Sequence, residues 1–150
     1  MGYRSDIAIG IAFDTYEQFV SFVTKTKLSP DFSQEEFDAY YHTIYKHGES
    51  EVHTIYMYNE DVKWYPGYPD VEWHNKLMEE AKKSDASVYF IRIGEELGDI
   101  ETDYSSSNSS DSMDALFNMM GVNQSIYAPV SEQSVTEFLS LSKGINHESL

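Results

Sequence analysis

The carboxylates with the clearest potential for chemistry in this sequence are grouped in one segment of expected turn and strand. They are Glu95, Glu96, Asp99, Glu101 and Asp103. Asp99, Glu101 and Asp103 alternate along the chain, so a strand would place them on one face, about 6.6–6.8 Å apart. Such a row can imitate the phosphates of a nucleic-acid backbone toward a protein that binds one. The alternative is a solvated edge strand whose charges discourage association between strands.

A second group of residues combines aromatic rings with cations. It comprises Lys63, Trp64, Tyr65, Tyr68, His74 and Arg92. Trp and Tyr supply large contact areas at low entropic cost, so such a segment, stiffened by Pro66 and Pro69, can line a ligand pocket or anchor an interface. The alternative is that the rings close one end of the core. Arg92 stands among apolar residues and is expected to pair with Glu101 or Asp61, with anion binding as the alternative role.

Motifs for the common catalytic and cofactor sites are missing from the sequence. It has no cysteine, no glycine-rich phosphate loop, no G-x-S-x-G nucleophile motif, and no H-x₃-H or H-E-x-x-H histidine pair. With 26 carboxylates in 150 residues, pairs of acids arise by chance and identify no acid–base site. We therefore expect a binding protein and not an enzyme, with no cofactor and no metal.

The overall charge narrows the choice of partners. The chain has 26 Asp and Glu against 10 Lys and Arg, a net charge of −16 at pH 7. Direct binding of nucleic acid or of an anionic membrane depends on clustered Lys and Arg, so neither is an expected partner. The content of hydrophobic residues, 41%, is enough for a folded core. The expected location is the cytoplasm, since the sequence shows neither a signal peptide nor cysteine.

The elements that would position these residues follow from hydrophobic periodicity. Residues 5–13 form a continuous apolar run typical of a strand buried on both faces. Apolar residues at helical spacing predict a first helix to about residue 27. After a capping box at Ser33, they predict a second helix with an aromatic stripe that continues to Tyr45. The β-branched and aromatic residues 51–58 predict a strand.

The following segments complete the expected sheet. Residues 71–83 are expected to form a helix, and residues 87–94 and 99–104 two strands joined by a turn with glycines. The order is therefore β-α-α-β-α-β-β, followed by two short C-terminal helices. The predicted fold class is α+β, with a mixed or antiparallel sheet and helices packed on it.

The composition changes in the serine-rich segment 105–112, which is typical of a flexible linker or loop. This segment would divide an α/β main domain, residues 1–104, from residues 113–150. The latter are expected to hold short helices at 113–120 and 131–143. Such an appendage is too small for a core of its own and should dock on the main domain.

Three segments together carry a resemblance to a known group of proteins. They are residues 1–6 (MGYRSD), residues 61–71 (DVKWY and YPDV) and residues 90–101 (FIRIGE and DIE). In this order and spacing they resemble small, acidic, largely uncharacterised proteins encoded by bacteriophages and prophages, over about residues 1–104. That family has no established activity, so the resemblance transfers no catalytic residue. It implies an accessory protein that binds a host protein.

Three functions are consistent with the sequence. The leading hypothesis is a phage-type accessory protein in the host cytoplasm that inhibits a host protein with a basic surface, such as a CRISPR or restriction component, through an acidic surface that mimics DNA. The second is a small-ligand or nucleotide-binding protein, or an enzyme, that uses the aromatic and cationic group. The third is a virion or assembly component whose stripe of Tyr40, Tyr41 and Tyr45 pairs with a second copy in a homodimer.

Overall fold

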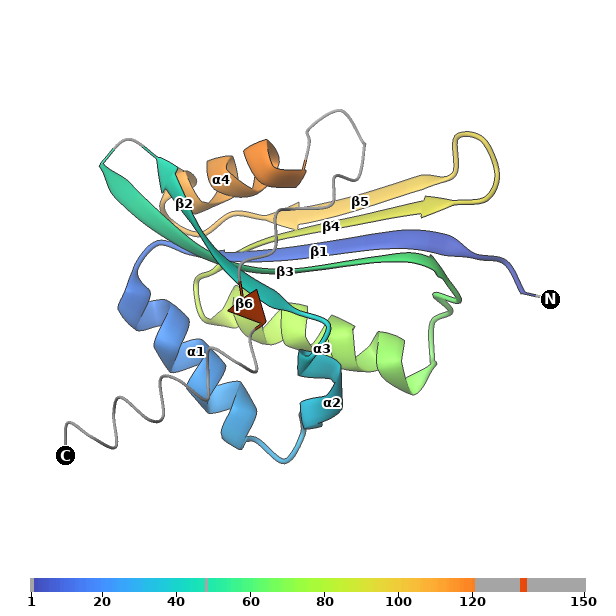
Figure 1. Cartoon of the computed structure of the whole chain (residues 1–150), viewed down its shortest axis with the longest axis horizontal. Helices are drawn as coiled ribbons and strands as arrows, with labels where there is room; N and C mark the ends of the chain where they lie inside the picture. The colour runs from blue at the N-terminus through green and yellow to red at the C-terminus, as the bar shows by residue number, and fades with distance from the viewer. Residues whose placement is uncertain (1, 48, 121–132, 135–150) are drawn as a thin grey trace.

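The structure is a computed structural model that describes residues 2–47, 49–120 and 133–134 (Figure 1). Its strands are β1 (Ser5–Phe13), β2 (Tyr41–His47), β3 (Ser50–Val62), β4 (Ser87–Gly94), β5 (Ile100–Ser105) and β6 (Gln133–Ser134). Its helices are α1 (Tyr16–Leu28), α2 (Gln34–Phe37), α3 (Pro69–Lys83) and α4 (Ser110–Met120). The strands form one sheet in the order β5-β4-β1-β3-β2-β6, in which all these neighbours are antiparallel. The predicted α+β class is confirmed, in its antiparallel form.

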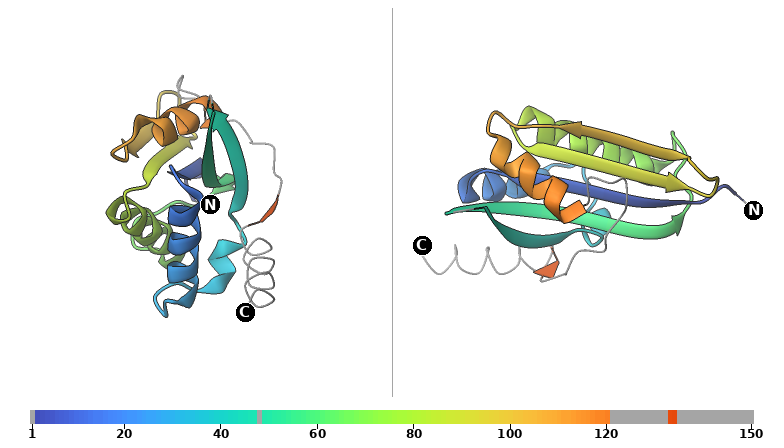
Figure 2. Two further views of the ribbon diagram at one scale, coloured as in Figure 1. Left: turned by 90° about the vertical axis from the view of Figure 1, so that its left-hand side faces the viewer. Right: turned by 90° about the horizontal axis from the view of Figure 1, so that it is seen from above.

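β1 lies inside the sheet, and its alternating side chains supply two hydrophobic clusters. Ile9 and Ile11 are fully buried in the larger cluster, together with Leu77 of α3. The small side chains Ala8 and Ala12 point to the opposite face, where they pack in a second cluster with residues of α4. Helices α1, α2 and α3 therefore cover one face of the sheet and α4 the other (Figures 1 and 2).

The second predicted helix is wrong beyond its first turn. α2 ends at Phe37, and the following residues form β2, which pairs with β3 so that Tyr41 lies opposite Tyr56. Aromatic and β-branched residues dominate this segment, and they pack well on a pleated surface. Pairing with β3 supplies the backbone hydrogen bonds, and helical spacing of the aromatic residues carries no information about that distant partner. The tyrosine stripe expected for assembly is therefore not formed: Tyr40 is fully buried, and Tyr41 and Tyr45 belong to a strand.

The serine-rich segment, which the composition predicts to be flexible, makes buried hydrogen bonds to the body of the protein. Ser87 of β4 and Ser112 of α4 are both fully buried, and their hydroxyl oxygens lie 2.7 Å apart. Ser107 donates its backbone N–H to the Ser87 oxygen at 2.9 Å and its hydroxyl to the Asp14 carboxylate at 2.8 Å. These bonds connect the segment to β4 and to the end of β1.

Replacing Ser87 with alanine tests this buried connection. The substitution removes the acceptor of the Ser107 N–H and a partner of the Ser112 hydroxyl. A buried donor left without an acceptor costs about 1–3 kcal/mol. We therefore expect Ser87→Ala to lower the free energy of unfolding in urea by this amount. The exposed Ser21→Ala is the control and should stay within about 0.5 kcal/mol of the wild type; equal effects would contradict the prediction.

The two predicted C-terminal helices have different outcomes. The first is present as α4, which begins at Ser110. Of the second, predicted at 131–143, only residues 133–134 are described. They form the short strand β6 opposite Tyr41 and His42, so a helix is wrong there. The other residues of that prediction lie outside the described part of the chain, and the proposed division into two domains stays a prediction.

Candidate functional site

The turn between β4 and β5 is held by a polar cluster around Asp99. Asp99 precedes the first residue of β5, and its backbone oxygen accepts the Gly94 N–H at 2.8 Å. Its carboxylate accepts hydrogen bonds from the Arg92 guanidinium, at 2.8 and 3.2 Å, and from the Tyr3 hydroxyl. The hydrogen bonds from Arg92, and then that from Tyr3, lower the pKa of Asp99 to about 2. A Cβ atom at Gly94 would collide with this carboxylate, so the close approach requires glycine.

Glu101 and Asp103 lie on the same face of β5 as the Asp99 carboxylate, as the alternation predicts. The Glu101 carboxylate accepts a hydrogen bond from Arg92 Nε at 2.9 Å, which confirms the predicted pairing. The Asp103 carboxylate lies 3.6 Å from the ammonium nitrogen of Lys82 on α3. Basic side chains therefore contact each of the three aligned carboxylates and reduce the net charge of the row.

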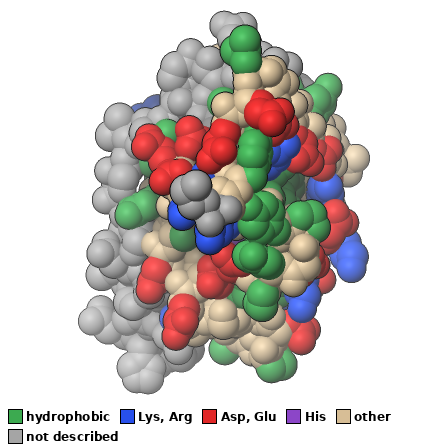
Figure 3. Space-filling view, turned by 90° about the vertical axis from the view of Figure 1, so that its right-hand side faces the viewer, with side chains coloured by type: hydrophobic (Ala, Val, Ile, Leu, Met, Phe, Trp, Pro, Cys, Tyr) green, Lys and Arg blue, Asp and Glu red, His purple; other side chains and the backbone are tan. Residues whose placement is uncertain are grey.

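At the β4–β5 end of the sheet, the negative charges most accessible to solvent are those of Glu95 and Glu96 in the turn. Both side chains are exposed. Glu95 accepts the backbone N–H of Arg4 at 3.1 Å, and Glu96 donates its own backbone N–H to the Tyr3 hydroxyl at 3.0 Å. Within the described part of the chain, neither carboxylate forms an ion pair. Figure 3 shows acidic side chains gathered over this end of the molecule, next to hydrophobic ones.

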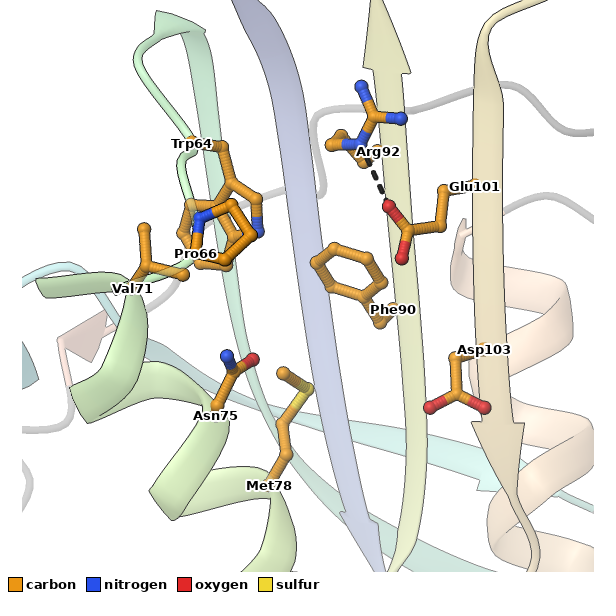
Figure 4. Close-up of a pocket in the computed structure, with 9 residues that line it drawn as sticks. All are labelled: Trp64, Pro66, Val71, Asn75, Met78, Phe90, Arg92, Glu101 and Asp103. Atoms are coloured by element: carbon orange, nitrogen blue, oxygen red, sulfur yellow. Dashed lines mark hydrogen bonds and ion pairs between the residues drawn. The ribbon is translucent and has the colours of Figure 1, made fainter. Parts of the chain in front are cut away.

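A cleft of about 380 Å³ opens between α3 and the β4–β5 edge (Figure 4). It lies next to the β4–β5 turn that carries Glu95 and Glu96 (the acidic turn). It is lined by Trp64, Pro66, Val71, Asn75, Met78, Phe90, Arg92, Glu101 and Asp103. The Trp64 and Phe90 rings, with centroids 5.9 Å apart, and the nearly buried Met78 form an apolar wall. Glu101 and Asp103 point into the cleft from β5. The cleft therefore joins an aromatic wall to a carboxylate rim.

The structure separates the six residues of the predicted aromatic and cationic group. Trp64 and Arg92 line the cleft, whereas Lys63, Tyr65, Tyr68 and His74 do not. Tyr65 and Tyr68 pack edge to face, with ring centroids 5.2 Å apart, and Lys63 and Tyr65 lie beside Gly2. His74 is buried behind Trp64, and its Nδ1 accepts the Tyr40 hydroxyl at 2.8 Å. The sequence alone does not show how residues on different elements are aligned, so this separation could not be predicted from it.

Arg92 does not fit the alternative role of binding a ligand anion. All three nitrogens of its guanidinium group donate to side chains, namely Ser5, Asp99 and Glu101. The hydrogen bonds that Arg92 donates to Asp99, and then the one to Glu101, raise the pKa of Arg92 further above its ordinary value. The side chain is 17% exposed, so its charge is used inside the cluster. Arg92 is therefore a structural cation that connects β4 with β5 and the turn.

Several residues of the site were missed by sequence reasoning. Tyr3 lies 96 positions from Asp99, and Lys82 reaches Asp103 from another element. Asn75 and Met78 enter the cleft from one face of α3. The spacing of Asn75 and Met78, three residues apart on a helix, is the one local signal that places them together.

Comparisons with known proteins add no family to this geometry. No family model matches the chain, and neither a curated protein nor a solved structure matches it. In the part of the chain that the structure describes, none of the helices is long and apolar enough to span a membrane. In the same residues, no group of three or more His, Cys, Asp or Glu side chains is arranged to hold a metal ion.

Proposed function

We propose that this chain is a phage-type accessory protein that acts in the host cytoplasm by binding and inhibiting a host protein with a basic, nucleic-acid-binding surface. A defence protein of the CRISPR or restriction type has such a surface. The proposed contact is the acidic end formed by Glu95, Glu96, Asp99, Glu101 and Asp103. The observation that carries the proposal is the pair of exposed carboxylates in the β4–β5 turn, which form no ion pair among the described residues.

The cluster beneath the turn supports this function. Arg92 and Tyr3 hold Asp99, and this fixes the backbone from which Glu95 and Glu96 project. A fixed arrangement of charges loses little conformational entropy on binding. Because Arg92 donates to carboxylates of the protein itself, its charge does not oppose a basic partner. The net charge of −16 adds long-range attraction that speeds encounter and weakens with salt.

Reversal of the two exposed charges tests the proposal. The double variant Glu95→Lys/Glu96→Lys should lose at least about tenfold in binding to a basic partner, because like charges at an interface cost several kcal/mol. The control, Asp31→Lys/Glu35→Lys, makes the same change in net charge at two exposed sites near α2. Immobilised wild type and both variants would be exposed to host lysate at low and high salt, and the retained proteins identified by mass spectrometry.

The expected result has two parts. The host protein held by the wild type and by the control variant should be missing from the Glu95→Lys/Glu96→Lys variant. Added double-stranded DNA should release it from the wild type, because DNA and the acidic end would occupy the same basic surface. Equal retention by the reversed variant, or retention that DNA does not affect, would refute a DNA-mimicking contact.

The cleft supports a second candidate function, the binding of a small ligand. Its volume of about 380 Å³ and its Trp64 and Phe90 wall suit an apolar or aromatic group. The exposed Asn75 amide and the carboxylates of Glu101 and Asp103 would accept hydrogen bonds from such a ligand. A thermal-shift screen of cationic and neutral metabolites tests this function, and stabilisation that is lost in Trp64→Ala would favour it.

A further inference from the structure

β5 occupies one edge of the sheet and pairs only with β4 among the described strands (Figure 2, right). Its side chains from Ile100 to Tyr104 are all exposed. The edges of sheets carry unpaired backbone N–H and C=O groups that can pair with the strand of another chain. The outer side of β5 is therefore a place where an extended peptide can bind.

The register of the hairpin shows which backbone groups of β5 face outward. The Gly94 N–H donates to the Asp99 oxygen, and hydrogen-bonded pairs alternate along an antiparallel ladder. Glu101, opposite Arg92, and Asp103, opposite Phe90, therefore direct their backbone groups toward β4. By the same alternation, Thr102 and Tyr104 direct theirs away from the sheet. The Ile100 N–H also lies on the outer side but already donates to the Gly98 oxygen at 3.0 Å, so of this residue only the C=O is open.

The two faces of this edge differ in chemistry. On the face that carries α4, Ile100 is 38% exposed and Tyr104 is 61% exposed, so two large hydrophobic side chains lie open beside the edge. On the face that carries α3, Glu101 and Asp103 border the cleft. Each of these carboxylates has one oxygen engaged, Glu101 with Arg92 and Asp103 with Lys82. Their other oxygens make no contact with a cation in the described residues.

We propose that the β5 edge binds an extended segment of the partner protein as an added strand, in which basic and apolar residues alternate. This inference rests on the proposed function and specifies the mode of binding. Backbone bonds to Thr102, to Tyr104 and to the C=O of Ile100 would hold the segment. Its basic side chains would lie beside Glu101 and Asp103, and its apolar side chains would cover Ile100 and Tyr104, since cross-strand neighbours share a face.

A second copy of this chain is a poorer occupant of the same edge. If two β5 strands paired in antiparallel register, Glu101 and Asp103 of one copy would face the same carboxylates of the other. Like charges on directly opposite residues destabilise a sheet. The homodimer expected from the sequence is therefore not favoured at this edge, whereas a basic segment is.

The test uses the full chain and a short, blocked peptide that alternates lysine and valine. Two control peptides isolate the mode of binding. One has the same composition with all lysines before all valines, so that it cannot place its charges on one face. The other has every second backbone amide methylated, which removes the donors toward β5. Binding is measured by calorimetry at low and high salt.

Two protein variants make the matched comparison. Thr102→Pro removes an outward N–H, and proline is tolerated in edge strands where that group faces solvent. Thr102→Ala is its control and keeps the N–H. We expect the alternating peptide to bind at least about tenfold more weakly to Thr102→Pro, consistent with the loss of one or two net hydrogen bonds. Thr102→Ala should bind as the wild type does, and the methylated and block peptides should bind weakly to the unaltered protein.

The outcomes separate this inference from the proposed function. Equal binding of the methylated and unmethylated alternating peptides to the wild type would overturn strand addition without any change to the protein. A second outcome concerns the capture of the host protein. If Thr102→Pro retained this protein and Glu95→Lys/Glu96→Lys lost it, strand addition would fail and the proposed function would stand. If binding of the alternating peptide were lost with Thr102→Pro while charge reversal left host capture unchanged, strand addition would stand and the proposed function would fail.

Discussion

Acidification from pH 7 to about pH 4.5 is expected to remove much of the stability of this protein, because three histidines are buried in their uncharged form. His42, His53 and His74 are each at most 7% exposed. Burial lowers the pKa of His42 and of His74 from 6.5 to about 4, and it also lowers that of His53. The three side chains must therefore gain protons on unfolding in this pH range.

The direction of the effect follows from these values. A histidine whose folded pKa lies below 6.5 contributes its full stability above pH 6.5 and loses it as the pH falls toward 4. At pH 4.5 the loss is about 2 kcal/mol for His42 and about 2 kcal/mol for His74. Nearby Asp70 acts in the opposite direction on His74, whose Nε2 also faces the Glu36 carboxylate at 3.4 Å, and Glu51 and Glu17 act in the opposite direction on His53. Burial outweighs these charges, and the pKa of each histidine stays lowered. Domains of this kind have total stabilities of about 5–15 kcal/mol, so the change is large.

Urea unfolding at several pH values measures this dependence. The variant His42→Phe keeps a flat ring against Phe19, on which His42 stacks with a centroid distance of 4.4 Å. It removes one titrating group and its hydrogen bond with His53, so the two proteins are compared by their change in stability with pH and not by their stability at one pH. Its loss of stability between pH 7 and pH 4.5 should be smaller than that of the wild type by about 2 kcal/mol. A wild-type stability that stays constant over this pH range would contradict the prediction. So would a variant whose free energy of unfolding changes with pH as much as that of the wild type.

Local patterns were sufficient to predict the elements that have strong and unambiguous periodicity. The bounds predicted for the first strand, 5–13, and for the strand at 87–94 are those of β1 and β4. Both are continuous apolar runs, which are typical of strands covered on two faces. The Arg92–Glu101 pair was also predictable, because a short turn brings neighbouring strands into a register that the sequence reveals.

The predictions that the structure contradicts concern segments whose interaction partners are distant in the sequence. Residues 41–47 carry aromatic side chains at a spacing that fits a helix as well as a strand, and only pairing with β3 decides between the two. The serine-rich segment has the composition of a flexible loop, yet the Ser107 N–H and the Ser112 hydroxyl find a buried partner in Ser87 of β4, and the Ser107 hydroxyl donates to Asp14. Tyr3 contacts Asp99, which lies 96 positions later in the sequence. No local pattern carries such contacts, and they include the interactions that shape the candidate site.

The substitution Leu116→Ala should destabilise the entire fold, because α4 contributes to the core that covers the second face of the sheet. Leu116 and Ala115 are fully buried and Met113 is 4% exposed. They pack in one cluster with Ala12 of β1 and Tyr89 of β4. Truncation of a buried leucine to alanine costs about 2–5 kcal/mol, since it removes apolar contacts and leaves a cavity. One of these strands, β4, carries Arg92 and leads into the turn that holds Glu95 and Glu96.

This substitution also distinguishes an integral helix from a weakly attached appendage. If α4 belongs to the cooperative core, urea unfolding of Leu116→Ala should remain one transition with an unchanged slope and a midpoint shifted to lower urea. The exposed Asn118 on the same helix provides the control Asn118→Ala, which should change stability by less than about 0.5 kcal/mol. An appendage that detaches on its own would instead give a separate early transition, or a stability of the sheet that Leu116→Ala does not alter. In that case the acidic turn and the β5 edge would keep their geometry without α4, and the division near residues 105–112 would be a real domain boundary.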